Sequence, residues 1–215
     1  VRRQNDLRPG GWEPAARIED QDVEGVEAEI LFGSVGGAPL MSQDPALTRA
    51  GFTAHNRWLA DFCSYAPSRL IGVGCVPCDD PDDALREVEL IAQLGMRGVV
   101  VSHTPGTGSW ADEAWTPFLR RLVELDLPAH LHVSVGTSRP MGDISSRGDL
   151  FMNYLVRSKL DLPVALGAFV YGGLLEKHPG LKLVSVEAQI GWVPFWKQYI
   201  DHVYENHRYW TGNHL

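Results

Sequence analysis

The chain has 215 residues, and 44% of them are hydrophobic, which is enough for one substantial core. Its 19 basic and 27 acidic residues give a formal net charge of −8, whereas general nucleic-acid binding would need a basic face. No run approaches the roughly 18 apolar residues of a membrane span, so we expect no nucleic-acid partner and no membrane segment.

The two ends of the sequence and its three cysteines bear on the extent of the domain and on its cellular location. It begins with Val1 rather than Met and ends at Leu215, a few residues after an amphipathic run. No apolar signal-peptide segment is visible, and three cysteines are too few for a disulfide scaffold. We therefore expect one domain over residues 1–215, truncated at both ends and located in the cytoplasm.

Polar residues and turn-forming residues such as Pro9-Gly10-Gly11 dominate the first 27 positions. We interpret this segment as an irregular stretch that leads into the first strand. From there on, short β-prone runs alternate with longer amphipathic ones, and several are almost continuously apolar, as parallel strands buried on both faces are. The predicted strands are Ala28–Phe32, Leu70–Val76, Arg97–Val101, Ala129–Ser134 and Lys182–Glu187.

The segments between these strands have helical periodicity. Asp44-Pro45 and Asp80-Pro81 predict two helix starts, because aspartate can accept from free amides and proline fits the first turn. Irregular sequence rich in Gly, Ser and Pro is expected over Ser134–Asp149. One wide apolar stripe predicts a last helix, with Trp192, Phe195, Trp196, Tyr199, Ile200 and Val203 on it.

Alternating strands and helices predict an α/β fold with a parallel sheet. A doubly wound open sheet and a (β/α)₈ TIM barrel both satisfy the pattern. No Gly-x-Gly-x-x-Gly follows a strand and no Gly-Lys-Ser/Thr motif occurs, which disfavours the nucleotide-binding open sheets. The barrel is therefore the favoured architecture.

His130 and His132 lie two residues apart in one predicted strand, so both imidazoles should point to the same face. Neutral imidazole is the commonest side-chain ligand for a divalent metal. Two half-buried histidines bonded to their neighbours would give the same spacing. The pattern alone leaves both interpretations open.

Two further polar residues follow predicted strands. Glu187 ends the last strand, where a carboxylate at the mouth of a barrel can ligate a metal or move protons, although it could equally cap the next helix. His103 follows the third strand and would open onto the same face, in reach of a substrate or of a backbone partner.

Cys75 and Cys78 stand between a strand and a helix, the usual place of a redox dithiol. A reactive thiol needs a positive environment, whereas four carboxylates follow this pair within Asp79–Asp83. We interpret both as ordinary core cysteines.

Several segments, in order along almost the whole chain, resemble the amidohydrolase-related family, in the branch of the aminocarboxymuconate-semialdehyde and resorcylate-type decarboxylases. The segments are Gly11-Trp12-Glu13-Pro14 with Arg17, Gly25-Val26-Glu27-Ala28-Glu29, His55–Cys63, Pro67–Val73, Lys177–Lys182 and Glu187–Pro194. The resemblance implies a metal-dependent (β/α)₈ barrel of which strands two to six are present.

The resemblance also implies roles for individual residues. His132 matches the fifth-strand histidine that binds a divalent metal, usually zinc, and His130 then falls outside the ligand set. Glu187 occupies the position after the sixth strand, where decarboxylases of this branch have histidine, and we expect it to be the catalytic acid or base. Apart from the resemblance, Arg139 in the loop after the fifth strand, with His103 and Trp192, is expected to contact a small carboxylic acid substrate, and Arg147 in the same loop is a second candidate. Solvated loop arginines are the alternative interpretation of Arg139 and Arg147.

The first-strand His-x-His pair and the eighth-strand aspartate of this family have no match in the sequence. The expected function is a hydrolase or a non-oxidative decarboxylase (carboxy-lyase) of a small carboxylic or aromatic acid, in the full-length protein. The alternative is a non-catalytic barrel fragment that associates through the aromatic helix near Trp192–Trp210. A homodimer is compatible with either function.

Overall fold

Six parallel strand segments and seven helices make up the computed structural model, which describes residues 8–33, 44–106, 108–132 and 148–213. The strands are β1 (Glu29–Leu31), β2 (Leu70–Gly72), β3 (Gly74–Cys75), β4 (Val99–Ser102), β5 (Ala129–His132) and β6 (Leu183–Val186). The helices are α1 (Pro14–Glu24), α2 (Pro45–Ser64), α3 (Pro81–Gln93), α4 (Thr116–Glu124), α5 (Gly148–Tyr171), α6 (Leu174–Lys177) and α7 (Val193–Thr211). Short 3₁₀ turns lie at η2 (Pro9–Gly11) and η4 (Glu113–Trp115).

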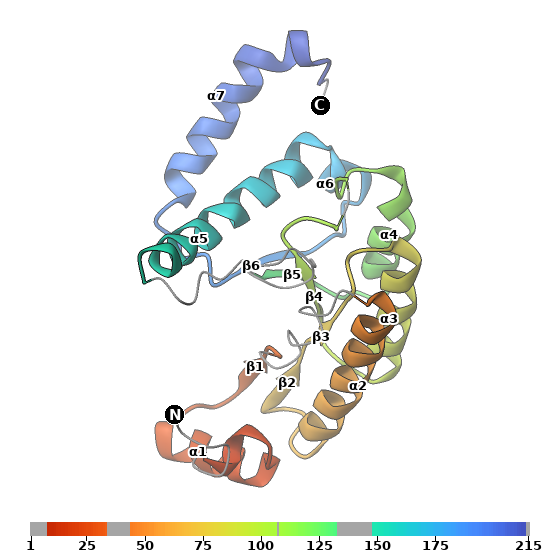
Figure 1. Cartoon of the computed structure of the whole chain (residues 1–215), viewed down its shortest axis with the longest axis vertical. Helices are drawn as coiled ribbons and strands as arrows, with labels where there is room; N and C mark the ends of the chain where they lie inside the picture. Colours follow the sequence, from red (N-terminus) through yellow and green to blue (C-terminus); the bar gives the residue numbers. More distant parts are fainter. Residues whose placement is uncertain (1–7, 34–43, 107, 133–147, 214–215) are drawn as a thin grey trace.

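Every strand pairing is parallel, as the sequence predicts. β1 pairs with β2, and β3, β4, β5 and β6 follow one another in a second sheet. Figure 1 shows the strands in an arc between α1 at one end and α7 at the other. This is the architecture of part of a (β/α) barrel, so the predicted fold class is confirmed and the open doubly wound alternative is set aside.

The predicted strand Leu70–Val76 is one run that bends at Val73 and pairs on both sides. β2 bonds to β1 before the bend, and β3 bonds to β4 after it. The Val73 N–H donates to the carbonyl of Leu31 at 3.3 Å, and Gly74 donates to Gly98 at 3.0 Å. The two sheets are therefore consecutive parts of one curved surface.

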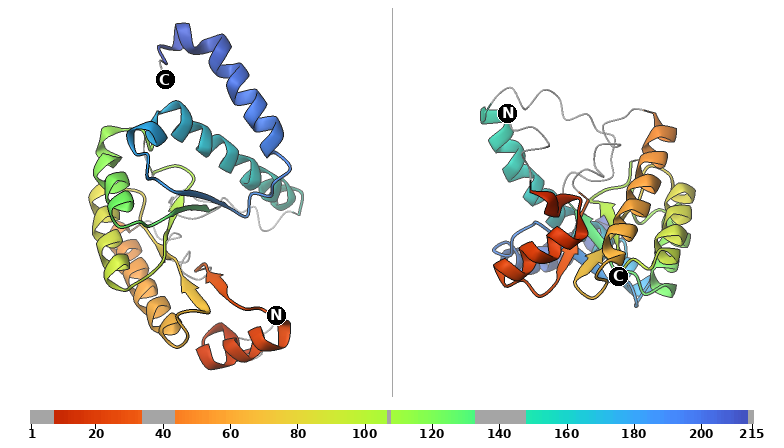
Figure 2. Two further views of the ribbon diagram at one scale, coloured as in Figure 1. Left: turned by 180° about the vertical axis from the view of Figure 1, so that it is seen from behind. Right: turned by 90° about the horizontal axis from the view of Figure 1, so that it is seen from below.

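The main core lies between the strands and the helices α2, α3 and α4, which cover one side of the sheet in both views of Figure 2. Strand residues such as Val99, Val101 and Leu131 are almost completely buried there. β4 is buried at every position, in keeping with the apolar run Val99–Val101.

Both predicted helix starts are confirmed. The Asp44 carboxylate accepts from the Ala46 N–H at 2.9 Å at the start of α2. The Asp80 carboxylate accepts from the N–H groups of Asp82 and Asp83, at 2.9 and 3.0 Å, at the start of α3. A proline follows each cap, where its missing N–H costs no helical bond.

The expectation of irregular structure over the first 27 residues is wrong, because α1 forms within them. Pro14 occupies the first turn, and Gly25 ends the helix in the left-handed conformation at φ 69°. Ile18 packs against the core, while Val23 is 80% exposed. A single apolar anchor gives no amphipathic stripe, so the periodicity did not reveal this helix.

The apolar stripe predicted for the last helix divides between two surfaces of α7. Trp192, Trp196 and Ile200 are half-buried, whereas Phe195 and Tyr199 are 67% and 54% exposed. α7 lies at the end of the molecule farthest from α1 (Figure 1) and contains no fully buried residue. Among the helices of the described ranges, none is both long and apolar enough to cross a membrane.

Candidate functional site

The carboxyl ends of β4, β5 and β6, here called the carboxyl edge, bring three predicted residues into neighbouring positions. Ser102 is in register with His132, and His132 with Val186. His103 directly follows Ser102, and Glu187 directly follows Val186. Parallel strands end at one common edge, so His103, His132 and Glu187 all lie there.

The imidazoles of His130 and His132 point away from the layer formed by α3 and α4. Ala129 and Leu131, which alternate with them, belong to the core that includes these helices. Phe32, just after β1, packs its ring against both imidazoles, with centroids 5.5 Å from His130 and 5.6 Å from His132. Both histidines thus face the concave side of the sheet, as their spacing predicts.

His130 is held in a tight, largely apolar place. It is 5% exposed, and a side chain on Gly98 would come within 2.8 Å of its Nε2 atom. Its Nδ1 atom is buried without a hydrogen-bond partner in the part of the chain that the structure describes. Burial, with a smaller effect of His132, lowers the pKa of His130 and favours the neutral ring.

Glu187 leaves the strand in an unusual backbone conformation. Its φ of 58° lies in the left-handed region, which a non-glycine residue rarely adopts, and Gln189 repeats this at 61°. The Glu187 side chain is 56% exposed, and its Oε2 atom lies 3.4 Å from Nζ of Lys159 on α5. An open carboxylate beside an ammonium group is therefore positioned at the carboxyl edge.

The three residues predicted to contact a substrate differ in their burial and in their hydrogen bonds. The Trp192 indole N–H donates to the carbonyls of Ala188 and Gln189, at 2.8 and 3.2 Å, and thereby holds the turn before α7. Its polar atom is engaged in the fold, and only its half-buried ring is open to other contacts. His103 is half-buried at the carboxyl edge. Arg139 and Arg147 lie outside the described residues.

Two titratable residues near the strand ends were not singled out from the sequence. His55 on α2 stands against Gly33, just after β1; its Nε2 atom is buried without a partner among the described residues, and burial lowers its pKa. Asp79 follows β3 and lies against Gly106 in the loop after β4, and burial raises the pKa of its carboxyl group. Asp79 is one of four aspartates in a short run, so the sequence does not distinguish it from its neighbours. His55 is a single histidine on a helix, and no pattern in the sequence marks it as functional.

The cysteine interpretation is confirmed. Cys75 and Cys78 are 1% and 0% exposed and form no disulfide. Burial raises the pKa of the Cys75 thiol to about 12 and that of Cys78 to about 11. Such thiols contain almost no thiolate near neutral pH, so they suit neither redox chemistry nor metal ligation.

The chemistry of the carboxyl edge fits a divalent metal only in part. His132 offers an imidazole on the concave face, and the neighbouring His130 is kept neutral by burial. Within the described ranges, no three His, Cys, Asp or Glu side chains come together as a metal site. A catalytic zinc takes about three protein ligands, so these residues supply one part of a ligand set.

Comparisons with known proteins agree with this geometry. A family model described as amidohydrolase matches residues 1–213. The chain is 26% identical over 201 residues to gamma-resorcylate decarboxylase of Polaromonas sp., covering 86% of this chain and 58% of that protein. It is 23% identical over 199 residues to 2-amino-3-carboxymuconate-6-semialdehyde decarboxylase of Dictyostelium discoideum, covering 89% and 52%.

A solved structure extends the comparison. The fold matches 5-carboxyvanillate decarboxylase of Novosphingobium aromaticivorans with a TM-score of 0.70 and 27% identity, over 88% of this chain and 54% of that one. That structure holds manganese and 3-methoxy-4-hydroxy-5-nitrobenzoic acid. The chain thus spans somewhat more than half the length of these relatives.

Proposed function

Because the chain belongs to the amidohydrolase family, we propose that the full-length protein is a metal-dependent carboxy-lyase that decarboxylates a small aromatic acid. The relatives favour decarboxylation over hydrolysis, since the three named above are decarboxylases. The single observation that carries the proposal is the adjacency of His132 and Glu187 at the ends of the paired strands β5 and β6.

His132 is the proposed metal ligand from this chain. It ends β5 on the concave face, and Phe32 packs against its ring. The His-x-His pair and the aspartate that the family resemblance implies are not among the described residues, and we propose that they complete the set. A bound divalent metal would act as a Lewis acid that polarises substrate oxygens. The family resemblance favours zinc as this metal, and manganese, which is bound in a related structure, is the alternative.

Glu187 is the proposed acid or base. In a decarboxylation the bond to the carboxylate carbon breaks, carbon dioxide leaves, and the carbon left behind must gain a proton. An exposed carboxyl group at the carboxyl edge can deliver that proton. In a hydrolysis the same carboxylate would take a proton from the attacking water, so this residue serves either reaction.

Substrate binding is proposed for residues around this pair. Lys159, 3.4 Å from Glu187, offers an ammonium group to a substrate carboxylate at the carboxyl edge. His103 adds an imidazole from the end of β4, and the Trp192 ring adds apolar surface after β6. Arg139 keeps its proposed role in carboxylate binding, although it lies outside the described residues.

The test is metal content and carbon dioxide release in the full-length protein with aromatic acids such as 2,6-dihydroxybenzoate. His132→Ala should lose most of the bound metal and the activity, because one ligand is removed from a small set. Glu187→Gln should keep the metal and lose activity by about 100-fold or more, the usual scale for a general acid or base.

His207→Ala is the matched control, since His207 is exposed on α7 and should leave both properties unchanged. Equal metal content in wild type and His132→Ala would refute the ligand role. Full activity in Glu187→Gln would refute the acid–base role. Water-dependent cleavage of an amide or ester without carbon dioxide release would favour the hydrolase instead.

Association through α7 is a second proposal. Phe195, Tyr199 and His202 stack in sequence along an exposed surface of the helix, with centroids 5.4 and 6.3 Å apart, which suits a homodimer contact. Sedimentation of wild type and of Phe195→Ser/Tyr199→Ser decides the matter: a dimer should become monomeric, and an unchanged mass would exclude this surface. A cytoplasmic location, suggested by three free cysteines, stays a proposal that cell fractionation tests.

A further inference from the structure

The turn between β6 and α7 contains two residues in a backbone conformation that side chains disfavour. Glu187 and Gln189 have φ angles of 58° and 61°, on either side of Ala188. In this left-handed region the Cβ atom lies too close to the following carbonyl oxygen, so a residue other than glycine adopts it at a cost in free energy. Such strained positions persist only where the surrounding structure imposes them, and they are frequent at functional sites.

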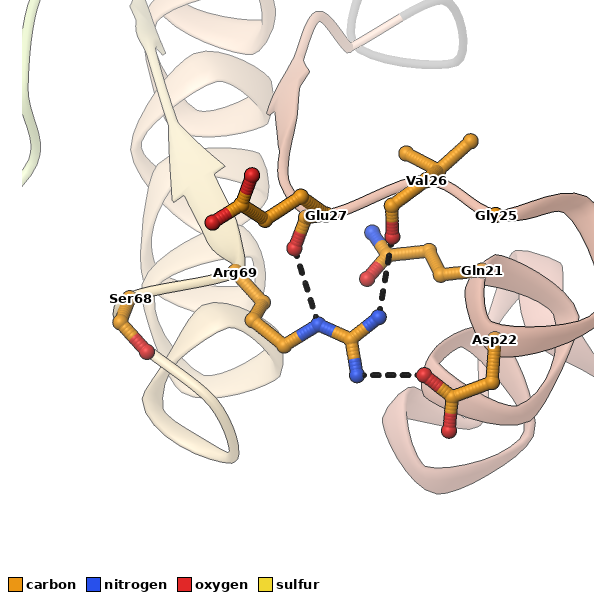
Figure 3. A pocket seen from close by; sticks show the side chains of 7 residues that line it. All are labelled: Gln21, Asp22, Gly25, Val26, Glu27, Ser68 and Arg69. Carbon is orange, nitrogen blue, oxygen red and sulfur yellow. Dashed lines mark hydrogen bonds and ion pairs between the residues drawn. The ribbon is translucent and has the colours of Figure 1, made fainter.

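The loop after α1 shows how the chain makes a left-handed position without this strain. The residue there is Gly25, at φ 69°, which has no Cβ atom. Arg69 fastens the loop by donating to the carbonyls of Val26 and Glu27, each at 3.0 Å (Figure 3). The turn after β6 has no glycine at either left-handed position, so its conformation depends more strongly on the contacts that it makes.

The Trp192 indole fastens the turn after β6. Its Nε1 atom donates to the carbonyls of Ala188 and Gln189, at 2.8 and 3.2 Å. Within the described ranges, no backbone N–H donates to either carbonyl. Ala188 is 3% exposed and belongs to the main core, against which the Trp192 ring also packs. The indole therefore joins the strained turn to a rigid part of the molecule.

The conformation of this turn determines where the Glu187 carboxylate lies. The left-handed φ at Glu187 ends β6 at Val186, because a strand requires extended backbone. The side chain then leaves the carboxyl edge 56% exposed, with its Oε2 atom 3.4 Å from Nζ of Lys159. An extended residue here would continue the alternation of the strand and direct its side chain elsewhere. A change in the turn would therefore move the carboxylate.

We propose that Trp192 is a positioning residue for Glu187, and that its indole N–H holds the left-handed turn that keeps the carboxylate at the carboxyl edge. This role is separate from any contact of the Trp192 ring with a substrate, because it belongs to the polar atom alone. The inference rests on the proposed function of Glu187 as acid or base. Such a group works only within hydrogen-bond reach of its proton partner, so a small displacement slows the reaction.

Trp192→Phe in the full-length protein removes the N–H and keeps an apolar ring. We expect kcat to fall about tenfold or more, the scale of a misplaced catalytic group, while KM and metal content stay within about twofold of wild type. Trp196→Phe is the matched control. Its half-buried ring packs on Trp192 with centroids 5.8 Å apart, and its indole N–H has no hydrogen bond to another described residue, so kcat and KM should stay as in wild type.

A zero-length cross-link reports the position of Glu187 without any need for activity. A carbodiimide should join the Glu187 carboxyl group to the Lys159 amine, 3.4 Å away, and peptide mass spectrometry measures the yield. The pair of Lys182 and Asp126, at 2.6 Å before β6 and β5, is the internal reference. Loss of the Trp192 N–H should lower the first yield several-fold and leave the second unchanged, and the control variant should change neither.

Gln189→Gly tests whether the N–H acts through the left-handed turn. Glycine adopts a φ of 61° without the steric cost, so the turn should keep its shape with less support. Added to Trp192→Phe, it should restore most of the cross-link yield and of kcat, a recovery that a merely structural role of Trp192 would not give. Benzothienylalanine at position 192, with sulfur in place of the N–H and nearly the same shape, repeats the test if the phenylalanine variant is unstable.

Three results would overturn the proposal. One is a wild-type yield of the cross-link between Lys159 and Glu187 in a folded variant that lacks the Trp192 N–H. Another is an equal loss of yield in Trp192→Phe and Trp196→Phe, which would assign the effect to ring volume. The third is a double variant that recovers nothing. If wild type releases no carbon dioxide, the proposed function fails, while the cross-link yield still tests the position of Glu187, so the two failures are distinguishable.

Discussion

At the scale of single residues, burial controls the protonation of His178 and makes stability depend on pH. His178 follows α6, is 9% exposed, and has its pKa lowered from 6.5 by burial and by the nearby charges of Arg120 and Lys177. As the pH falls below 6.5, the unfolded chain takes up a proton before the folded chain does. The free energy of unfolding should therefore decrease as the pH falls, until the folded-state pKa is reached.

His178→Asn should make this decrease shallower, by at most about 1.4 kcal/mol per pH unit, the limit for one group. Urea unfolding at a series of pH values below 6.5 measures the slope. The control is Gln198→Asn, a change of an exposed and non-titrating residue of α7, which should leave the slope as in wild type. A slope unaffected by His178→Asn would mean that other groups cause the acid sensitivity.

At the scale of elements, one buried network joins α2, α3 and β3. Asn56 is fully buried; its amide nitrogen donates to the Cys75 carbonyl at 2.8 Å and to Glu87 Oε1 at 2.7 Å, and its oxygen accepts from the Cys75 N–H at 2.8 Å. Thr53 donates to the other Glu87 oxygen at 2.8 Å. This network satisfies the backbone of β3 next to the bend at Val73.

Asn56→Ala should lower the free energy of unfolding by about 2–4 kcal/mol, because it leaves the Cys75 backbone and the Glu87 carboxylate without their partner in a buried place. Chemical denaturation gives the value. Asn206→Ala, which removes a side chain bonded to His202 on the exposed side of α7, should cost less than about 0.5 kcal/mol. Equal effects of the two substitutions would show that the Asn56 network adds no stability.

At the scale of the whole molecule, metal binding should depend on the parts of the fold that this sequence does not supply. The described residues hold no group of three ligands, while the matched relatives are almost twice as long as the matched segment. We expect about one divalent ion per full-length chain and weak or no binding by residues 1–215 alone. Analysis of the metal content of both proteins after dialysis tests this expectation. Tight binding of one metal ion per chain by residues 1–215 would mean that the ligands are wrongly assigned.

The sequence predicted the residues at the carboxyl edge better than their surroundings. Two-residue periodicity correctly oriented His130 and His132, and strand ends located His103 and Glu187. The sequence did not predict that Lys159 pairs with Glu187, 28 residues away. It also did not predict that Phe32 packs on both histidines. Such contacts depend on how α5 and β1 pack, and local periodicity carries no information about packing.

The sequence by itself determined the parallel α/β class, five strand regions and two aspartate-capped helix starts, because these follow from local hydrophobic patterns and capping chemistry. Only the tertiary structure decided that the run Leu70–Val76 bends to pair with β1 and β4, that α1 forms on one apolar anchor, and that the stripe of α7 divides into a half-buried and an exposed surface. It also decided that the Gln21 amide is buried with no hydrogen-bond partner among the described residues. Each of these outcomes depends on which surfaces distant segments cover, and that coverage is fixed only when the chain packs.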